Sequence, residues 1–488
     1  MKKGISLLLA LLILTLTPVF TYCGSMEAQA DVTEQSTTEL TETETTVNYL
    51  ETLPKEDFNG AAYTIAAQST EQRPNLPAEE ENGEILNDSL IQRNRAVSER
   101  YNIEIASIIY PGKTDPANAV QKAVLANDYL CDLVICYIAS GGMSTIAQGG
   151  YLYDLADIDM LSLGENWWCA SFYDDVNIDG SLYFTTGPLS PSFYYAPHLF
   201  VYNLTLAEAY NLPDMVSVVL DGDYTFDYFI SLTKNVSADI DGDGAMTAAD
   251  LFAVTHTGDG RGPLYGLGGS FSSRASDGSL VLDLENSAIV GKIQLLYDFM
   301  SDKITCFSDN TTVKALTMFQ SDRALFFLSA ANNIITGYSD VPSCREMESD
   351  YGFLPMPKQT ESQEGYYTCS SVHMPTGIGV PLVIEDPHRT GLVTETIAYL
   401  SYNSYVREAA YEKVVKAKVA REQRHEEVLD LIYAGVRFDN NYIMDFGGTC
   451  VLMADCSGGA NPNYVSSVAA KLPAAEKAMN DYIALFSK

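Results

Sequence analysis

Apolar and polar positions alternate along the first third of the chain in a way that predicts strands separated by helices. Residues 61–70 form a short apolar run that ends in polar residues, which predicts a strand. Residues 87–102 carry apolar side chains at helical spacing. Two further strand patterns, 103–110 and 131–138, lie on either side of a helical pattern at 115–127. This alternation is typical of an open α/β sheet.

Ligands of such sheets bind on the loops that follow the carboxyl ends of the strands. The first of these loops begins with Gln68, in "QST", and another is "ASGGM" after Ile138. We therefore take Gln68 as a candidate binding residue. Tyr137 is a second candidate, because it lies at the end of its strand.

The rest of the chain has a different pattern. Residues 200–214 predict a strand followed by a short helix, and Thr225 is placed to cap a helix that begins at Phe226. Residues 313–333 read as a helix that leads into a strand. The last quarter of the chain is largely helical.

One stretch, "ADIDGDGAMTAADL" at 238–251, carries acidic residues at the spacing of a calcium-binding loop. A glycine stands at the sixth position of the loop, where the chain must turn sharply. The predicted ligands are Asp239, Asp241, Asp243, the backbone carbonyl of Ala245, and Asp250. The final Asp, in place of Glu, resembles the loops of dockerin modules. Only one such loop is present, so we expect Ca²⁺ to be structural and not to be sensed.

The alternative interpretation of this stretch is an acidic surface turn that leads into a helix. Thr247 followed by Asp250 three residues later is close to a capping box, which predicts that a helix begins there.

The N-terminus predicts export. Residues 1–22 combine two lysines with a long apolar run, as in a signal peptide. Cys23, followed by Gly and Ser, resembles the lipidated cysteine of bacterial lipoproteins, and cleavage after Ala30 is the alternative. Residues 23–57 are expected to form a disordered acidic tether. We therefore expect the protein at the extracellular face of the cell membrane, held only by a lipid anchor, or secreted.

Charge and cysteine content narrow the partners further. The net charge of −35 excludes nucleic acid, whose phosphates would be repelled. Eight cysteines follow Cys23, and an even number outside the cell permits disulfides. Cys131 and Cys136 fall within one apolar strand pattern, so we expect them to be small buried residues.

Catalytic motifs are absent from the sequence, and we expect no enzyme. His425 begins "HEEVLD", which lacks the second histidine of a zinc-protease motif and is expected on a solvated helix face. The sequence contains neither a G-x-S-x-G elbow nor a phosphate-binding P-loop. Two alternatives stay open: a secreted glycoside hydrolase, since many carboxylate pairs exist, and a calcium-dependent surface-binding module.

Six segments in order resemble the extracellular solute-binding proteins of ABC importers, in particular the large carbohydrate-binding type. They cover the chain from about Tyr63 to about Lys413. Asp322 stands where the family's pattern in the fifth segment has a glycine. The segments are "ANDYLCDLVICYIASGGMSTIAQGGYLYDLADID", "WWCASFYDDVNIDGSLYFTTG", "HLFVYNLTLAEAYNLPD", "YGLGG", "MFQSDRALFFLSA" and "DYGFLPMPK".

The resemblance implies an α/β, two-lobed periplasmic-binding-protein-like fold, with crossing strands and a cleft between the lobes. The chain would cross near 185–187, return near 327–329 and cross again near Leu400. Lobe 1 would comprise 58–186 and 328–399, and lobe 2 would comprise 187–327 and 400–488. The implied function is capture of a small solute, an oligosaccharide, and its delivery to the permease of an ABC importer by a monomer. The calcium loop would then lie in lobe 2, away from the cleft.

A sugar ligand needs aromatic faces and polar groups. The chain has 31 Tyr but only two Trp, which are adjacent at 167 and 168, and we expect at least one to be core. Acidic cleft walls would instead favour a cationic ligand. The candidate ligand-binding residues are Gln68, Tyr137, Trp168, Tyr194, Tyr195, Ser329 and Tyr367.

Overall fold

The computed structural model describes residues 48–70, 73–309, 311–374, 376–419 and 423–486. The predicted signal peptide, Cys23 and the tether up to residue 47 lie outside the described residues. Residues from Tyr49 onward form one compact unit. No helix among the described residues is both long and apolar enough to cross a membrane.

The part of the predicted tether from residue 49 to 57 differs from the prediction. Tyr49 begins a short 3₁₀ helix, and its ring lies 4.7 Å from that of Trp167 and 5.2 Å from that of Tyr399. Its hydroxyl donates a hydrogen bond to Glu395 at 2.8 Å. Tyr49 packs on these aromatic rings and Leu53 is 7% exposed, so residues 49–57 are not a disordered tether.

The first sheet has four strands in the order β12-β3-β1-β2, and β12 alone is antiparallel to its neighbour. α1 packs on β2, and α2 packs on β1 and β3. The predicted strands and helices of the early part of the chain are confirmed within a few residues. Their bounds are β1 (Ala61–Gln68), α1 (Ile85–Tyr101), β2 (Ile103–Tyr110), α2 (Asp115–Ala126), β3 (Leu133–Cys136), α3 (Met143–Gln148), α4 (Ala170–Val176) and β12 (Gly377–Gly379).

The second sheet has five strands in the order β10-β4-β9-β5-β8. All seven residues of β9 are buried, which places this strand in the core of the sheet. As predicted, Thr225 caps α7, since its side chain accepts a hydrogen bond from the Tyr228 amide at 3.3 Å. The bounds are β4 (His198–Asn203), α5 (Leu204–Ala209), α6 (Met215–Leu220), α7 (Phe226–Thr233), β5 (Phe252–His256), β8 (Cys306–Phe307), α10 (Thr312–Gln320), β9 (Ala324–Ala330), α11 (Ala331–Ile335) and β10 (Tyr351–Leu354).

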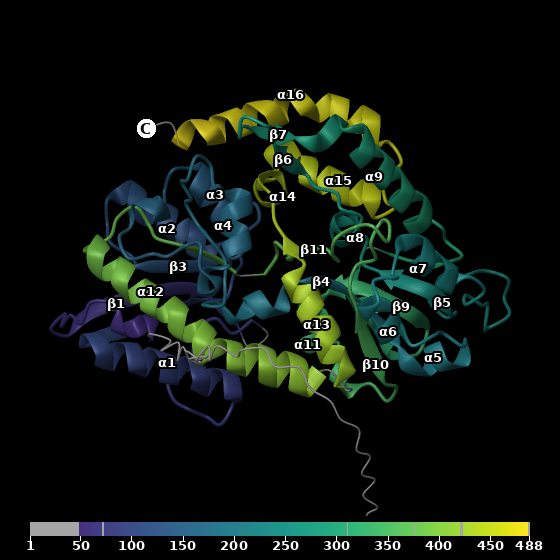
Figure 1. Cartoon of the computed structure of the whole chain (residues 1–488), viewed down its shortest axis with the longest axis horizontal. Helices are drawn as coiled ribbons and strands as arrows, with labels where there is room; N and C mark the ends of the chain where they lie inside the picture. The colour runs from purple at the N-terminus through teal and green to yellow at the C-terminus, as the bar shows by residue number, and fades with distance from the viewer. Residues whose placement is uncertain (1–47, 71–72, 310, 375, 420–422, 487–488) are drawn as a thin grey trace, which may run out of the picture. The chain divides into compact units, whose positions relative to one another are not determined.

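The last part of the chain is helical, as predicted, and Figure 1 shows it as the green and yellow helices that run beside both sheets. Two small ladders, β6 with β7 and β11 with β13, complete the described fold. The remaining bounds are α8 (Arg261–Gly266), β6 (Ser272–Arg274), β7 (Leu280–Leu282), α9 (Ser287–Met300), β11 (Thr368–Cys369), α12 (Pro387–Asn403), a π-helix (Arg407–Val419), α13 (Arg424–Ala434), β13 (Val436–Arg437), α14 (Asn440–Met444), α15 (Thr449–Ser457) and α16 (Tyr464–Ile483).

Two of the segments that connect the sheets lie side by side. The first runs from Thr185, which forms a bridge with Ile378, to Pro197, which forms a bridge with Ser370 just before β4. The chain therefore returns to the first sheet through residues 370–378, not near 327–329 as predicted. The physical reason is pairing: β9 runs through the middle of the second sheet, and β10 still pairs with β4.

Candidate functional site

Three adjoining cavities form a groove where the strand ends of the two sheets meet. Their volumes are about 620, 500 and 220 Å³. The first two share Thr70 and Thr336, and the last two share Arg73, Lys113 and Tyr338. We call these three cavities the groove. Its position beyond the carboxyl ends of β1, β2 and β9 is the one expected for ligands of open α/β sheets.

The first sheet contributes residues that directly follow β1 and β2. Gln68, the last residue of β1, is 2% exposed, and its carboxamide oxygen has no hydrogen-bond partner among the described residues. Arg73 lies beyond it, and Lys113 follows β2. Burial lowers the pKa of the Arg73 guanidinium, but an arginine at neutral pH stays protonated.

The second sheet contributes a chain of amides that follows β9. The side-chain amide of Asn332 donates to the side-chain oxygen of Asn333 at 2.8 Å. The side-chain amide of Asn333 in turn donates to the Ser329 hydroxyl at 2.9 Å. Gly337 then takes a left-handed conformation with φ of 76° in the turn that presents Tyr338. A Cβ at Gly337 would lie 2.3 Å from a backbone oxygen, so only glycine fits this turn.

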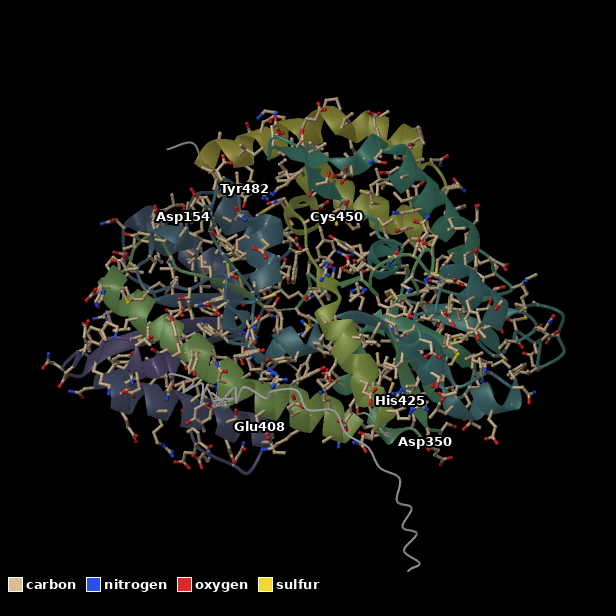
Figure 2. All side chains as sticks on the ribbon, in the orientation of Figure 1. Asp154, Asp350, Glu408, His425, Cys450 and Tyr482 are labelled. Carbon is tan, nitrogen blue, oxygen red and sulfur yellow. The ribbon has the colours of Figure 1, made fainter. Side chains whose placement is uncertain are left out.

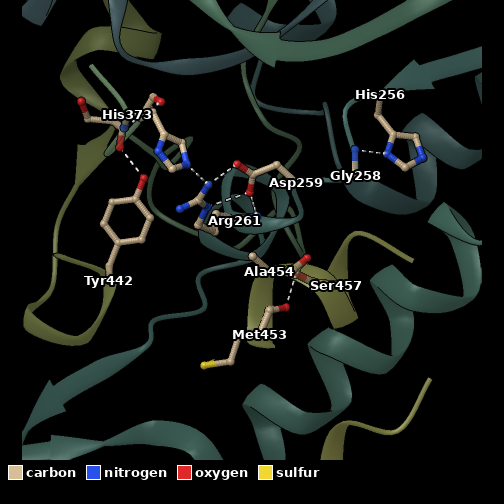
Figure 3. A network of polar contacts seen from close by, with 11 residues as sticks. His256, Gly258, Asp259, Arg261, His373, Tyr442, Met453, Ala454 and Ser457 are labelled. Carbon is tan, nitrogen blue, oxygen red and sulfur yellow. Dashed lines mark hydrogen bonds and ion pairs between the residues drawn. The ribbon is translucent and has the colours of Figure 1, made fainter. Parts of the chain in front are cut away.

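The floor of the smallest cavity contains a network of charged and imidazole groups (Figure 3). Arg261 donates to both carboxylate oxygens of Asp259, at 2.8 and 2.6 Å. A further N–H of Arg261 lies 3.3 Å from His373 Nε2, which therefore accepts. Burial, then the positive charge of Arg261, lowers the pKa of His373 to about 4. His198 is also buried, and its pKa is lowered mainly for that reason. Both imidazoles are consequently neutral at pH 7.

No known family profile and no curated protein matches the sequence. Solved structures do match. The galacto-N-biose-/lacto-N-biose I-binding protein of an ABC transporter from Bifidobacterium longum matches 87% of this chain and 98% of its own, with a TM-score of 0.59 and 12% identity. The chain has the fold of ABC-transporter solute-binding proteins.

Two further structures support this fold. A cyclo/maltodextrin-binding protein in complex with maltotetraose matches 87% of this chain and 96% of its own, with a TM-score of 0.56 and 12% identity. An ABC-transporter-associated binding protein from B. animalis subsp. lactis, in complex with β-1,6-galactobiose, matches 87% and 98%, with a TM-score of 0.53 and 14% identity. These neighbours are binding proteins of transporters, and the two-lobed α/β fold class expected from the sequence is confirmed.

Three of the candidate ligand-binding residues lie in or beneath the groove of this solute-binding-protein fold. Gln68 and Tyr195 line it directly. Ser329 is 2% exposed and lies beneath the groove, where it accepts the hydrogen bond of Asn333. Ser329 therefore positions the side-chain amide of Asn333 in the wall of the groove.

The other candidates lie elsewhere. Tyr137 donates to the backbone oxygen of Ser140. Tyr367 is half-buried, with the Arg437 guanidinium 4.7 Å from its ring centroid. Tyr194 is buried and lines a separate cavity of about 420 Å³, where its ring stacks on Tyr411.

Trp168 is part of the core, as expected for at least one of the two tryptophans. It is 1% exposed, and its indole N–H donates to Glu395 at 2.6 Å. The Trp167 indole N–H donates to the other oxygen of Glu395 at 2.8 Å. Both indoles therefore donate to a buried carboxylate on α12, and neither lines the groove.

The sequence reasoning missed most of the groove. It did not single out Arg73, Lys113, Asn332, Asn333 or Tyr338. The rule that selected Gln68 applies to them as well, since Lys113 follows β2 and the asparagines follow β9 directly. What the sequence lacked was the information that these strand ends face one another.

Three of the predicted calcium ligands converge. Asp239, Asp241 and Asp243 are exposed, and each brings one carboxylate oxygen within 4.8 Å of the others. Gly244 has φ of 83°, the left-handed conformation that the sharp turn requires. The loop is closed at its base by an antiparallel bridge between Ala238 and Leu251. This donor set fits a hard cation.

The end of the loop differs from the prediction. Asp250 is buried, and its oxygens accept hydrogen bonds from the backbone amides of Ile240 and Thr247, at 3.0 and 2.7 Å. Ala245 is exposed. No helix begins at Thr247; a turn leads into β5 instead, because Asp250 binds the loop backbone and the next residues pair with β9.

His425 and Cys450, both labelled in Figure 2, are buried, as are six of the seven other described cysteines, and Cys169 is partly exposed. His425 is 1% exposed, and its Nδ1 accepts from the Phe353 amide at 3.3 Å, so the expected solvated position is wrong. The reason is that α13 packs its His425 face on β10. Cys131 and Cys136 are buried as expected, and all eight described cysteines are free thiols.

Proposed function

We propose that this protein captures a small solute outside the cell and delivers it to the permease of an ABC importer. The observation that supports this proposal is the groove. It lies at the strand ends of two separate sheets, in a fold whose solved members are binding proteins of ABC transporters. A solute held by both walls would close the hinge between them.

The solute we propose is an oligosaccharide. The neighbours are described in complex with lacto-N-biose, maltotetraose and β-1,6-galactobiose. The groove offers what a sugar requires: amides at Gln68, Asn332 and Asn333 for hydroxyl groups, and the rings of Tyr195 and Tyr338 for apolar sugar faces.

Among the described residues, two acids line the groove, and both are engaged. Glu84 accepts a hydrogen bond from the Asn87 amide at 2.8 Å, and Asp259 is paired with Arg261. Burial acts to raise the pKa of Asp259, but the charge and hydrogen bonds of Arg261 outweigh it and hold that pKa well below its usual value. A carboxylate held ionised by a bidentate arginine is a poor general acid. We therefore propose binding without turnover.

Two accessory features belong to the same proposal. The loop from Asp239 to Asp250 would hold a structural Ca²⁺ through Asp239, Asp241 and Asp243. Cys23 would carry a lipid that anchors the monomeric protein to the outer face of the membrane. An unlipidated mature chain beginning at residue 31, found by mass spectrometry, would contradict the anchor.

A thermal-shift screen tests the binding function. The mature protein would be mixed with oligosaccharides, peptides and polyamines, and the products would be analysed by mass spectrometry. A ligand at about a hundred times its Kd adds about 2.7 kcal/mol to the free energy of unfolding, which is readable as a shift of a few degrees. We expect one ligand class to raise the Tm without product. Formation of product would contradict the proposal.

A further inference from the structure

The groove carries a charge opposite to that of the protein as a whole. The chain has 64 acidic and 29 basic residues. Yet among the described residues that line the 500 Å³ cavity, the charged ones are two cations, Arg73 and Lys113, and none is an acid. The same two cations also line the neighbouring 220 Å³ cavity. In a chain with a net charge of −35, a cavity whose charged lining residues are cations needs a physical explanation.

Asp259, the acid that lines the 220 Å³ cavity, does not neutralise these cations, and Glu84 lines only the 620 Å³ cavity, which neither cation lines. Asp259 is held by Arg261 in a bidentate ion pair, with the closest contact at 2.6 Å. That pair has no net charge. His198 and His373 are neutral at pH 7, since burial lowers the pKa of each. Arg73 and Lys113 therefore set the sign of the local potential.

Neither cation has a side-chain partner in the part of the chain that the structure describes. Among the residues that the structure describes, no hydrogen bond or ion pair engages the side chain of Arg73 or of Lys113. Arg73 is half-buried. A charge that is partly removed from water without a counter-charge is unfavourable, and an anionic ligand would remove that penalty.

Gln68 supplies a second, independent requirement. Its side chain lines the same cavity, is 2% exposed, and has a buried carboxamide oxygen without a partner among the described residues. An acceptor of this kind needs a donor such as a ligand hydroxyl. The cavity thus offers two cations for an anion and an acceptor for a hydroxyl.

Screening decides whether the overall negative charge would prevent an anion from binding. At physiological ionic strength the Debye length is about 8 Å, so exposed acids farther away contribute little. Charges that line the cavity act over a few ångströms and in a lower dielectric, where they are much stronger. The local cations therefore dominate once the solute is inside.

We propose that the solute is anionic: an oligosaccharide or related polyol that bears a carboxylate, sulfate or phosphate, bound beside Arg73 and Lys113 with a hydroxyl at Gln68. This inference rests on the proposed function, since it names the class of solute for the same groove. It replaces the cationic solute that an acidic chain would suggest.

Matched pairs of ligands test the inference. Isothermal titration would compare oligogalacturonates with neutral galacto-oligosaccharides of equal length, and glucose 6-phosphate with glucose, with inorganic phosphate as a probe of the anion alone. We expect an acidic member to bind at least about tenfold more tightly than its neutral counterpart, since charge-assisted hydrogen bonds are worth a factor of ten or more. The two acidic arms distinguish a carboxylate from a phosphate ligand.

Variants then assign the effect to the two cations. Arg73→Gln and Lys113→Gln should each weaken the acidic ligand about tenfold or more, and Arg73→Lys should restore part of the loss. Arg95→Gln is the matched control, because Arg95 pairs with Glu81 on the exposed face of α1. Lys113 is exposed, so its variant should fold even if an Arg73 variant does not.

The outcomes separate the inference from the proposed function. Equal affinity for neutral and acidic members, unchanged by Lys113→Gln, would overturn the anionic solute and leave the binding function standing. Tighter binding of a polyamine than of any acid would overturn it as well. Absence of binding by every member of the panel would count against both.

Discussion

Glu395 is a fully buried carboxylate that organises several side chains of the first lobe. It accepts hydrogen bonds from the Tyr49 hydroxyl, from both indole N–H groups of Trp167 and Trp168, and from the Ser162 amide. The donors come from two segments, Tyr49 and residues 162–168, and both are more than 200 residues from Glu395 in sequence. This one residue therefore explains why the two tryptophans face the interior.

Removal of this carboxylate should destabilise the protein severely. Glu395→Ala leaves the indole donors of the buried Trp168 and the half-buried Trp167 without an acceptor, and an orphaned buried donor costs about 1–3 kcal/mol. We expect a loss of about 3 kcal/mol or more in the free energy of unfolding, measured by urea denaturation. Glu408→Ala, at an exposed position, is the control. Equal stability of the two variants would show that the Glu395 contacts contribute nothing.

Buried histidines predict a dependence of stability on pH. Burial lowers the pKa of His256 to about 4 in the folded state, whereas the unfolded value is about 6.5. Between these values the unfolded state binds a proton that the folded state does not. The contribution is therefore fully present above pH 6.5 and is lost as the pH falls towards 4.

His256→Gln should consequently flatten the fall of stability between pH 6.5 and 4.5, an effect on the order of 1–3 kcal/mol in the free energy of unfolding. His388→Gln is the comparison, because hydrogen bonding to Glu56 raises the pKa of His388, so its contribution to stability is not lost as the pH falls below 6.5. Thermal unfolding at several pH values measures both. Parallel Tm curves for wild type and His256→Gln would refute the assignment.

At the scale of residues, the sequence predicts which side chains are buried better than it predicts which residues they contact. It indicated that a tryptophan would be core, yet it could not identify Glu395, which lies 227 residues from Trp168. His425 was placed wrongly for the same reason. A polar residue between charged neighbours looks solvated until the strand that covers it is known.

At the scale of elements, the loop from Asp239 to Asp250, which we propose binds Ca²⁺, is a closed unit. Its three exposed carboxylates repel one another, and its ends are tied by the bridge between Ala238 and Leu251. Binding of a cation removes the repulsion, so the stability gained should appear in the second sheet, whose strand β5 follows directly.

We expect Ca²⁺ to raise the Tm by a few degrees, and the double variant Asp241→Ala, Asp243→Ala to abolish the rise. Asp298→Ala, on the exposed face of α9, should leave it unchanged. Differential scanning calorimetry with calcium and with chelator measures the effect. An unmoved transition in the wild type would contradict the calcium site.

Elements with a strong local pattern were predictable. β2 coincides with its predicted range and α1, α2 and α7 begin close to theirs, because period and capping are local properties. Membership of a sheet is not local. β9 and β10 read as apolar strands in either lobe, and only their pairing with β4 assigns them to the second sheet.

At the scale of the whole molecule, the two sheets place their strand ends around one groove. The charged residues of its 500 Å³ cavity are cations, whereas the chain as a whole is acidic. The order of the segments indicated the fold, which the solved structures confirm. The groove residues could not be predicted in the same way, because Arg73, Lys113 and Asn332 become neighbours only when two sheets face each other.

The central claim is that one solute binds in this groove, and a calorimetric titration with a ligand from the screen tests it most directly. The account predicts one solute per chain, and an affinity lowered about tenfold or more by Asn333→Ala but unchanged by Tyr402→Ala, which alters the separate aromatic cavity. Affinity that is lost with Tyr402→Ala and retained with Asn333→Ala would contradict it and move the site to that cavity.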